Sequence, residues 1–184
     1  MRFAANYDYP VPPAAVAALM ADRDYLLAAA AAAGAESSQI EVVRAANGGF
    51  TVTIRSTMPP DQLPAAVRAF LPQGLELRQA LVWEPPAARD ADAAGAVGAT
   101  GAAGARQATM AGEVAGAAVR LSGLMRLTPT ASGCRSDFGG EVNAQLPLVG
   151  RAVEEAAVPA VVKVLDAQHR VALDWLDAAA PQTA

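Results

Sequence analysis

The chain has 184 residues, a net charge of −4 and an isoelectric point of about 4.9. This acidic balance leaves no basic surface for a nucleic acid, and charged residues interrupt every long apolar run, so we expect neither nucleic-acid binding nor stable membrane insertion. Hydrophobic residues make up 53% of the chain but aromatic residues only 5%, which predicts a core of Val, Leu and Ala that leaves space between small side chains.

A single domain over residues 1–178 is expected for this length, followed by a disordered tail at 179–184. The one cysteine, Cys134, excludes an internal disulfide and fits a reducing compartment. The first residues lack the basic and apolar regions of a signal peptide. We therefore expect a cytoplasmic protein, with its oligomeric state left open.

A half-buried strand is predicted over residues 2–9, because apolar and aromatic side chains alternate with polar ones. One face of this strand carries Phe3, Ala5, Tyr7 and Tyr9. Two short helices are predicted next. Pro13 suits the first turn of one helix, and Asp22 can cap the other, which ends at Gly34.

A β-hairpin is then predicted, with one arm at residues 38–45 and the other at 50–58. The sequence Asn-Gly-Gly at 47–49 accepts the positive φ that a tight hairpin turn needs. The second arm alternates, which places Phe50, Val52, Ile54 and Met58 on one face. A short helix or helical turn is expected within residues 61–70.

Four more strands are predicted, at residues 75–84, 106–114, 117–128 and 133–146. The first of these alternates and carries Leu75, Leu77, Leu81 and Trp83 on one face. The Ala- and Gly-rich segment 87–105 has no period and is expected to be a flexible loop without a chemical role.

The chain ends in one predicted helix at residues 148–177, roughly 45 Å long at 1.5 Å per residue. Pro159 is expected to bend it. A helix of this length needs a long partner surface, and the predicted sheet is the only candidate. We therefore predict an α+β helix-grip fold, in which a curved antiparallel sheet wraps around the C-terminal helix. The face of this helix that is expected to pack against the sheet holds Val153, Ala157, Ala160, Val161, Val164, Gln168, Ala172 and Trp175.

The order of elements and several short motifs resemble the START-like (SRPBCC) superfamily, and within it the uncharacterised family "domain of unknown function 2505" (DUF2505). The residues that carry the resemblance are Phe3 to Tyr9, Asp22-Arg23-Asp24-Tyr25, Leu63-Pro64, Val82-Trp83-Glu84, Pro147-Leu148-Val149-Gly150 with Glu154, and Trp175. The chain departs from the family at the insertion 87–105. The resemblance implies a START-like fold and, from the wider superfamily, binding of lipids, sterols, polyketides or similar molecules, with catalysis only in some branches.

No catalytic group, metal site or cofactor site is predicted. His169 is the only histidine and lacks partners for a triad or a metal, so we expect it on the polar flank of the last helix. Cys134 is expected to be a buried, unreactive thiol. The alternation of its strand puts a charged set on the solvent face, namely Arg135, Asp137, Glu141 and Asn143.

The sequence thus favours non-catalytic binding of a small hydrophobic molecule in a cavity between the sheet and the last helix. The residues expected to line it are Phe50, Val52, Ile54, Met58, Leu77, Gln79, Leu81, Trp83, Val119, Leu121, Met125, Phe138, Val142, Ala157, Val161, Val164 and Gln168. Two alternatives stay open. One is a cyclase or aromatase acting in the same cavity, which needs an inward acid or base. The other is a protein-interaction domain with a closed core, which needs an apolar patch on the outer sheet face, where we expect none.

Overall fold

The structure is a computed structural model that describes residues 1–68, 71–86 and 104–179. It contains one antiparallel sheet in the order β1-β7-β6-β5-β4-β3-β2, so β1 and β2 are its edges. The strands are β1 (Arg2–Tyr9), β2 (Ser37–Arg44), β3 (Phe50–Met58), β4 (Leu75–Trp83), β5 (Arg106–Val114), β6 (Val119–Thr130) and β7 (Gly133–Ala144). The helices are α1 (Pro13–Leu19), α2 (Arg23–Ala32), α3 (Ala65–Arg68) and α4 (Gly150–Ala179), with a 3-10 turn, η1 (Pro60–Gln62).

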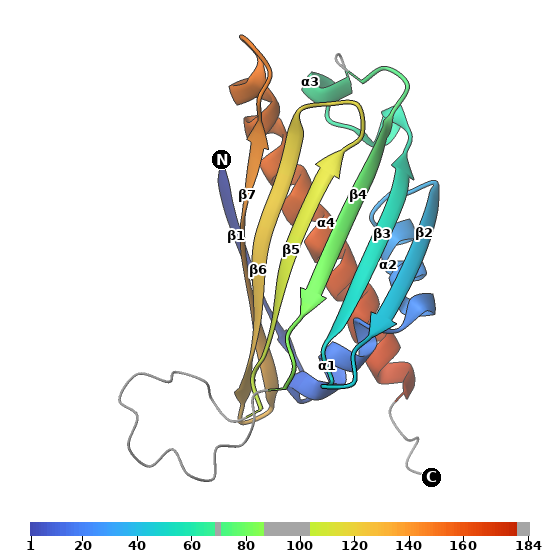
Figure 1. The fold of residues 1–184 in the computed structure, drawn as a ribbon, viewed down its shortest axis with the longest axis vertical. Coiled ribbons are helices and arrows are strands. Elements are labelled where there is room, and N and C mark those ends of the chain that lie inside the picture. Colours follow the sequence, from blue (N-terminus) through green and yellow to red (C-terminus); the bar gives the residue numbers. More distant parts are fainter. Residues whose placement is uncertain (69–70, 87–103, 180–184) are drawn as a thin grey trace.

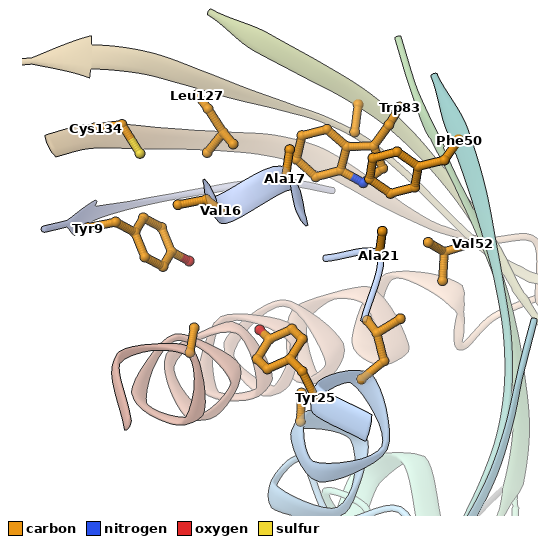
Figure 2. Close-up of a cluster of buried hydrophobic side chains, with 14 residues drawn as sticks. Tyr9, Val16, Ala17, Ala21, Tyr25, Phe50, Val52, Trp83, Leu127 and Cys134 are labelled. Atoms are coloured by element: carbon orange, nitrogen blue, oxygen red, sulfur yellow. The ribbon is translucent and has the colours of Figure 1, made fainter. Parts of the chain in front are cut away.

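The predicted fold class is confirmed. Helix α4 has 30 residues and runs obliquely across one face of the sheet, and α1 and α2 lie on the same side (Figure 1). The sheet curves around these helices, which occupy its concave face (Figure 2). No described helix covers the opposite, outer face of the sheet (Figure 1). Among the described residues, no helix is both long and apolar enough to cross a bilayer.

Local signals set the ends of the early elements. The side chain of Asp22 accepts a hydrogen bond from the backbone N–H of Tyr25 at 2.9 Å and so caps α2. In the β2–β3 turn, Gly48 has a φ of +84°, and the side chain of Asn47 accepts from the N–H of Gly49 at 3.0 Å. The predicted cap and the predicted hairpin are both confirmed.

The buried side chains form two separate groups on the concave face of the sheet. The first core cluster holds Tyr9, Val16, Ala17, Ala21, Tyr25, Leu26, Ala29, Phe50, Val52, Trp83, Ala108, Leu127, Cys134 and Ala172 (Figure 2). The second core cluster holds Phe3, Met110, Val114, Val119, Phe138, Val142, Ala144 and Val153. Leu81 and Met125 are only partly buried and pack against both. The helix α4 therefore reaches one cluster near its start, through Val153, and the other near its end, through Ala172.

Two predicted segments fall largely outside the described residues. These are the Ala/Gly loop 87–105, of which only residues 104 and 105 are described, and the tail 179–184, of which only Ala179 is described. The last helix begins and ends two residues later than predicted, at Gly150 and Ala179 rather than at 148 and 177.

Candidate functional site

The residues predicted to line a cavity divide into buried and partly buried groups. The buried ones belong to the two core clusters and are Phe50, Val52, Trp83, Val119, Phe138 and Val142. Phe50 and Trp83 are cross-strand partners on β3 and β4, and their rings stack with centroids 5.4 Å apart (Figure 2). These six side chains belong to the hydrophobic core, because other residues of the folded chain cover them.

A partly buried apolar set packs against the two clusters, and we call it the central seam. On the sheet it comprises Ile54, Leu77, Leu81, Leu121 and Met125, and on α4 it comprises Ala157, Val158, Val161 and Leu165. All nine pack against one cluster or both, yet none is fully covered. Apolar side chains on both facing surfaces thus stay accessible where a compact domain normally completes its core.

The four remaining predicted lining residues are half-buried and belong to neither cluster. They are Met58, Gln79, Val164 and Gln168. Gln79 of β4 is paired with Gly112 of β5. A Cβ on Gly112 would lie 3.3 Å from Cγ of Gln79. The backbone carbonyl of Gln168 accepts from the Tyr25 hydroxyl at 3.5 Å.

The sheet-facing stripe of α4 was predicted only in part. The structure adds Val158, Val162 and Leu165, which pack against the second core cluster. Together with Val161 and the fully buried Ala172, they follow the three- and four-residue spacing of one helix face. That spacing is present in the sequence, but so many positions of this helix are Ala or Val that it does not single out one face.

The prediction that His169 lies on a polar surface flank is wrong. Its ring is half-buried and stacks on Tyr7, with centroids 4.7 Å apart and planes 26° apart, while Tyr9 meets it edge-on at 4.9 Å. The Tyr7 hydroxyl donates to Asp166 of α4 at 2.8 Å. Nδ1 of His169 is buried and has no hydrogen-bond partner among the described residues. Burial lowers the pKa of His169 below its usual 6.5, and the carboxylates of Asp166 and Asp8 oppose that shift.

This environment predicts that His169 makes stability depend on pH. Because burial lowers the pKa in the folded state, the unfolded chain binds the imidazole proton more readily. The contribution of His169 is therefore fully present above about pH 6.5, the usual histidine value, and is lost as the pH falls towards the folded-state pKa.

The measurement is the free energy of urea unfolding at several pH values for the wild type and for His169→Phe. We expect the stability of the wild type relative to the variant to decrease as the pH is lowered from about 7.5 to about 5. Shifts of carboxylates, such as the lowered pKa of Glu154, occur in both proteins and cancel in the difference. A difference that is constant with pH, or that grows on acidification, contradicts the prediction.

Cys134 is buried, as predicted. Burial, with a further contribution from Asp8, raises the pKa of its thiol to about 11. A thiolate is the reactive form, so this cysteine has no features of a nucleophile.

The outer face of the sheet carries the predicted charged side chains. Arg135, Asp137, Glu141 and Asn143 are all exposed, and Arg135 pairs with Asp137 at 3.3 Å. Three apolar side chains are nonetheless exposed on this face. Val43, Val82 and Leu124 are 57%, 50% and 40% exposed. Strand register places them in one row, with Thr51 and Thr109 between them.

Two open hollows also lie on the outer face. The larger has a volume of about 650 Å³, and its floor is made by small residues, among them Ala80, Ala111 and Ser122. The smaller, of about 480 Å³, adjoins Leu124 and Gly139. Both are shallow and wide, whereas small-molecule sites bury most of their ligand. Within the described part of the chain, no three His, Cys, Asp or Glu side chains gather in a way that could hold a metal ion.

Comparison with solved structures supports the fold. A protein from Thermus thermophilus, TTHA0849, superposes with a TM-score of 0.61 at 14% identity, covering 98% of this chain and 100% of its own. A START superfamily protein from Mycobacterium smegmatis gives 0.52 at 10% identity, covering 95% and 98% of the two chains. A fragment of a STAR-related lipid transfer protein from Xanthomonas axonopodis gives 0.53 at 12% identity, covering 92% and 84%.

At these identities the likeness establishes a START-like fold and does not carry a function from one chain to the other. No curated protein matches the sequence significantly. The family described as "protein of unknown function (DUF2505)" matches residues 5–176, nearly the whole length. The chain is therefore a member of the DUF2505 family, with a START-like helix-grip fold.

Proposed function

We propose that this protein binds a small hydrophobic molecule, such as a lipid or a polyketide, between the concave face of the sheet and α4, and that it catalyses no reaction. The observation that carries the proposal is the central seam, which is apolar on both sides and incompletely covered. The reduced, buried Cys134 is compatible with a role in the cytoplasm.

Burial of apolar area supplies the binding energy in this proposal. A ligand that loses about 300 Å² of apolar surface to the seam gains roughly 7 kcal/mol at about 25 cal/mol per Å². The restriction of ligand motion and the ordering of side chains reduce this gain. What remains is below the roughly 8 kcal/mol of micromolar binding, so the seam alone supports an affinity weaker than micromolar, towards the millimolar range at about 4 kcal/mol.

The name of the Xanthomonas neighbour, a STAR-related lipid transfer protein, supports the same class of ligand. That support is limited to the shared fold, since only 12% of residues are identical. A fold that grips a helix in a curved sheet provides a concave, apolar surface of the kind that ligand sites use.

The cyclase or aromatase alternative needs an acid or a base inside the site. None of the nine residues of the central seam is ionisable. Two ionisable residues follow Leu165, the last seam residue on α4, and both contact Tyr7 of β1. Asp166 accepts a hydrogen bond from the Tyr7 hydroxyl, and the ring of His169 stacks on that of Tyr7. A binding role without catalysis therefore fits the seam better.

A protein-interaction role is the second candidate, and the row of Val43, Val82 and Leu124 favours it. These side chains are exposed on a sheet face that no described helix covers (Figure 1). A partner that bridges the intervening threonines would cover all three side chains in one contact. This role would use the outer face and so does not exclude a ligand on the concave face.

Native mass spectrometry of the purified protein tests both candidates at once. We expect a mass above that of the chain, which falls to the chain mass after extraction with organic solvent and releases a hydrophobic compound. A ligand-free protein that also fails to bind the uncharged fluorescent probe N-phenyl-1-naphthylamine contradicts the proposal. A ligand-free dimer, dissociated by Val82→Asp, would instead support the interaction role.

A further inference from the structure

We infer that the side-chain amide of Gln79 is the polar contact of the ligand site, and that the ligand is an uncharged molecule whose carbonyl or hydroxyl oxygen lies within its hydrocarbon frame rather than at one end. This inference rests on the proposed binding function and adds to it the chemical class of the ligand. It is drawn from the place of one accessible amide within an apolar surface and from the uncharged residues around it.

The side chain of Gln79 points to the concave face of the sheet. Side chains two residues apart on a strand share a face. Leu77, Leu81 and Trp83 occupy alternate positions of β4, and all three pack in or against the core clusters on the concave face. Arg78, the residue before Gln79, lies on the outer face, where it lines the larger hollow. The amide is thus directed into the space between the sheet and α4.

Apolar side chains of the central seam surround this amide on the sheet. Leu77 and Leu81 lie two residues before and after it on β4, each about 7 Å away along the strand. Across the sheet, Ile54 of β3 is its direct partner, and Leu121 of β6 lies beyond Gly112 in the same row. All four of these leucine and isoleucine residues belong to the central seam. The amide therefore lies within the seam and not at its border.

The amide is accessible, and Gly112 makes room for it. A Cβ at position 112 would come within 3.3 Å of Cγ of Gln79, so the glycine allows the stem of the glutamine to lie against the sheet. Gln79 is half-buried, and no described residue forms a hydrogen bond with its side chain. The described side chains that have polar atoms buried without a partner are Trp83, Arg106 and His169, and Gln79 is not among them. Its amide group can therefore be reached by water or by a ligand.

An accessible amide in an apolar site selects a ligand through the hydrogen bonds that must be kept. A ligand that covers the amide with hydrocarbon alone leaves an N–H donor and a C=O acceptor unpaired, which lowers its affinity. A ligand carbonyl can accept from the amide N–H, and a ligand hydroxyl can also donate to the amide oxygen. Because seam residues lie on every side of Gln79, a ligand that fills the seam needs hydrocarbon on both sides of that oxygen.

The uncharged surroundings select against an anionic ligand. No residue of the central seam is ionisable. A carboxylate buried there would lose its hydration and meet no seam cation, so a ketone, an alcohol or an ester is preferred over a fatty-acid anion. Gln79 is itself neither an acid nor a base, so this contact agrees with binding without catalysis.

The test compares nonan-5-one, nonan-2-one and nonanoate as competitors of N-phenyl-1-naphthylamine at neutral pH. The two ketones are isomers that differ only in the position of the oxygen. When nonan-2-one bonds to the amide, it leaves part of the seam on one side unfilled. We therefore expect nonan-5-one to displace the probe from the wild type at a concentration about fivefold lower than nonan-2-one. We expect nonanoate to require a concentration higher than that of nonan-5-one by about tenfold or more.

Gln79→Met tests the amide itself, because methionine keeps a side chain of similar length and removes both polar atoms. We expect this variant to bind the two ketones equally. In urea unfolding it should be at least as stable as the wild type, since an apolar group replaces a half-buried polar one. Gln39→Met makes the same change at an exposed position of β2 and should leave the preference for nonan-5-one intact. A loss of stability in Gln79→Met would show that Gln79 supports the fold instead, and would overturn the inference.

A second measurement uses only the wild type. In the ¹H–¹⁵N NMR spectrum, nonan-5-one should shift the side-chain NH₂ signals of Gln79 and leave those of Gln39 in place. Binding of nonan-5-one without that shift, equal displacement by nonan-2-one or nonanoate, or a preference that persists in Gln79→Met overturns the inference alone. Binding of the probe but of neither ketone has the same consequence. If neither the ketones nor the probe bind the wild type, the proposed function fails and this inference fails with it.

Discussion

Replacing Val161 with tryptophan is expected to lower the affinity for N-phenyl-1-naphthylamine at least tenfold while leaving the protein folded. Val161 belongs to the central seam and is only partly buried, near the middle of α4. An indole at this position would occupy the space between α4 and the sheet that a ligand needs. Fluorescence titration with the probe gives the affinity, and urea unfolding gives the stability.

The stability of this variant separates an open seam from a closed one. In a fully packed core, added atoms force strain that costs about 1–3 kcal/mol or more, whereas in open space the indole gains contacts. We therefore expect Val161→Trp to change stability by less than about 1 kcal/mol. Lys163→Trp places the same indole on the exposed side of α4 and should leave probe affinity unchanged. Wild-type affinity in Val161→Trp, or equal losses in both variants, would show that the ligand does not occupy the seam.

Replacing Gly140 with alanine is expected to destabilise the protein by about 1–3 kcal/mol, a cost typical of forced overpacking in a core. A Cβ at this position of β7 would lie 2.5 Å from Cζ of Phe3 and 2.5 Å from the backbone oxygen of Ser122. The backbone oxygen belongs to the paired strand β6 and cannot move without breaking the ladder. The ring of Phe3 cannot withdraw freely either, because it packs on Phe138 with centroids 5.7 Å apart.

Gly139→Ala is the matched control. It changes the adjacent residue of the same strand, and a Cβ there would meet nothing within 4 Å. We expect it to be neutral or slightly stabilising, since alanine has less backbone entropy to lose than glycine. The two variants are compared by the free energy of urea unfolding. Equal effects at both positions would mean that the close contact at Gly140 relaxes at little cost.

These two predictions concern different ends of the concave face. The contact at Gly140 supports the second core cluster, where Phe3 and Phe138 pack closely. Val161 lies beside that cluster, in the region that it leaves uncovered. The proposed ligand site thus adjoins the second core cluster.

Much of the fold was predictable because its signals are local. The Asn-Gly-Gly turn at 47–49 and the alternation of the following strand depend only on residues a few positions apart. The Asp22 cap is of the same kind. The long C-terminal helix was predicted within two residues at each end, because the spacing of apolar residues on a helix is visible in consecutive positions of the sequence.

The candidate site was predicted less completely. Six of its expected lining residues proved to be buried core residues, since alternation gives the face of a strand but not how well another element covers it. Whether the partly buried residues line a ligand site stays a prediction. Val158 and Leu165 were missed because α4 is apolar over much of its circumference, and its rotation is set by the surface against which it packs.

The surroundings of His169 and the apolar row on the outer face show most clearly what the sequence could not supply. Tyr7 and Asp166 are 159 positions apart, and no local pattern signals their hydrogen bond. The alignment of Val82 with Leu124 depends on the register of β4 with β5 and of β5 with β6. By itself the sequence determined the elements and the inner faces of the strands, because backbone geometry encodes these at short range. Only the tertiary structure decided the rotation of α4 and the cross-strand register, because these minimise the free energy of contacts between distant segments.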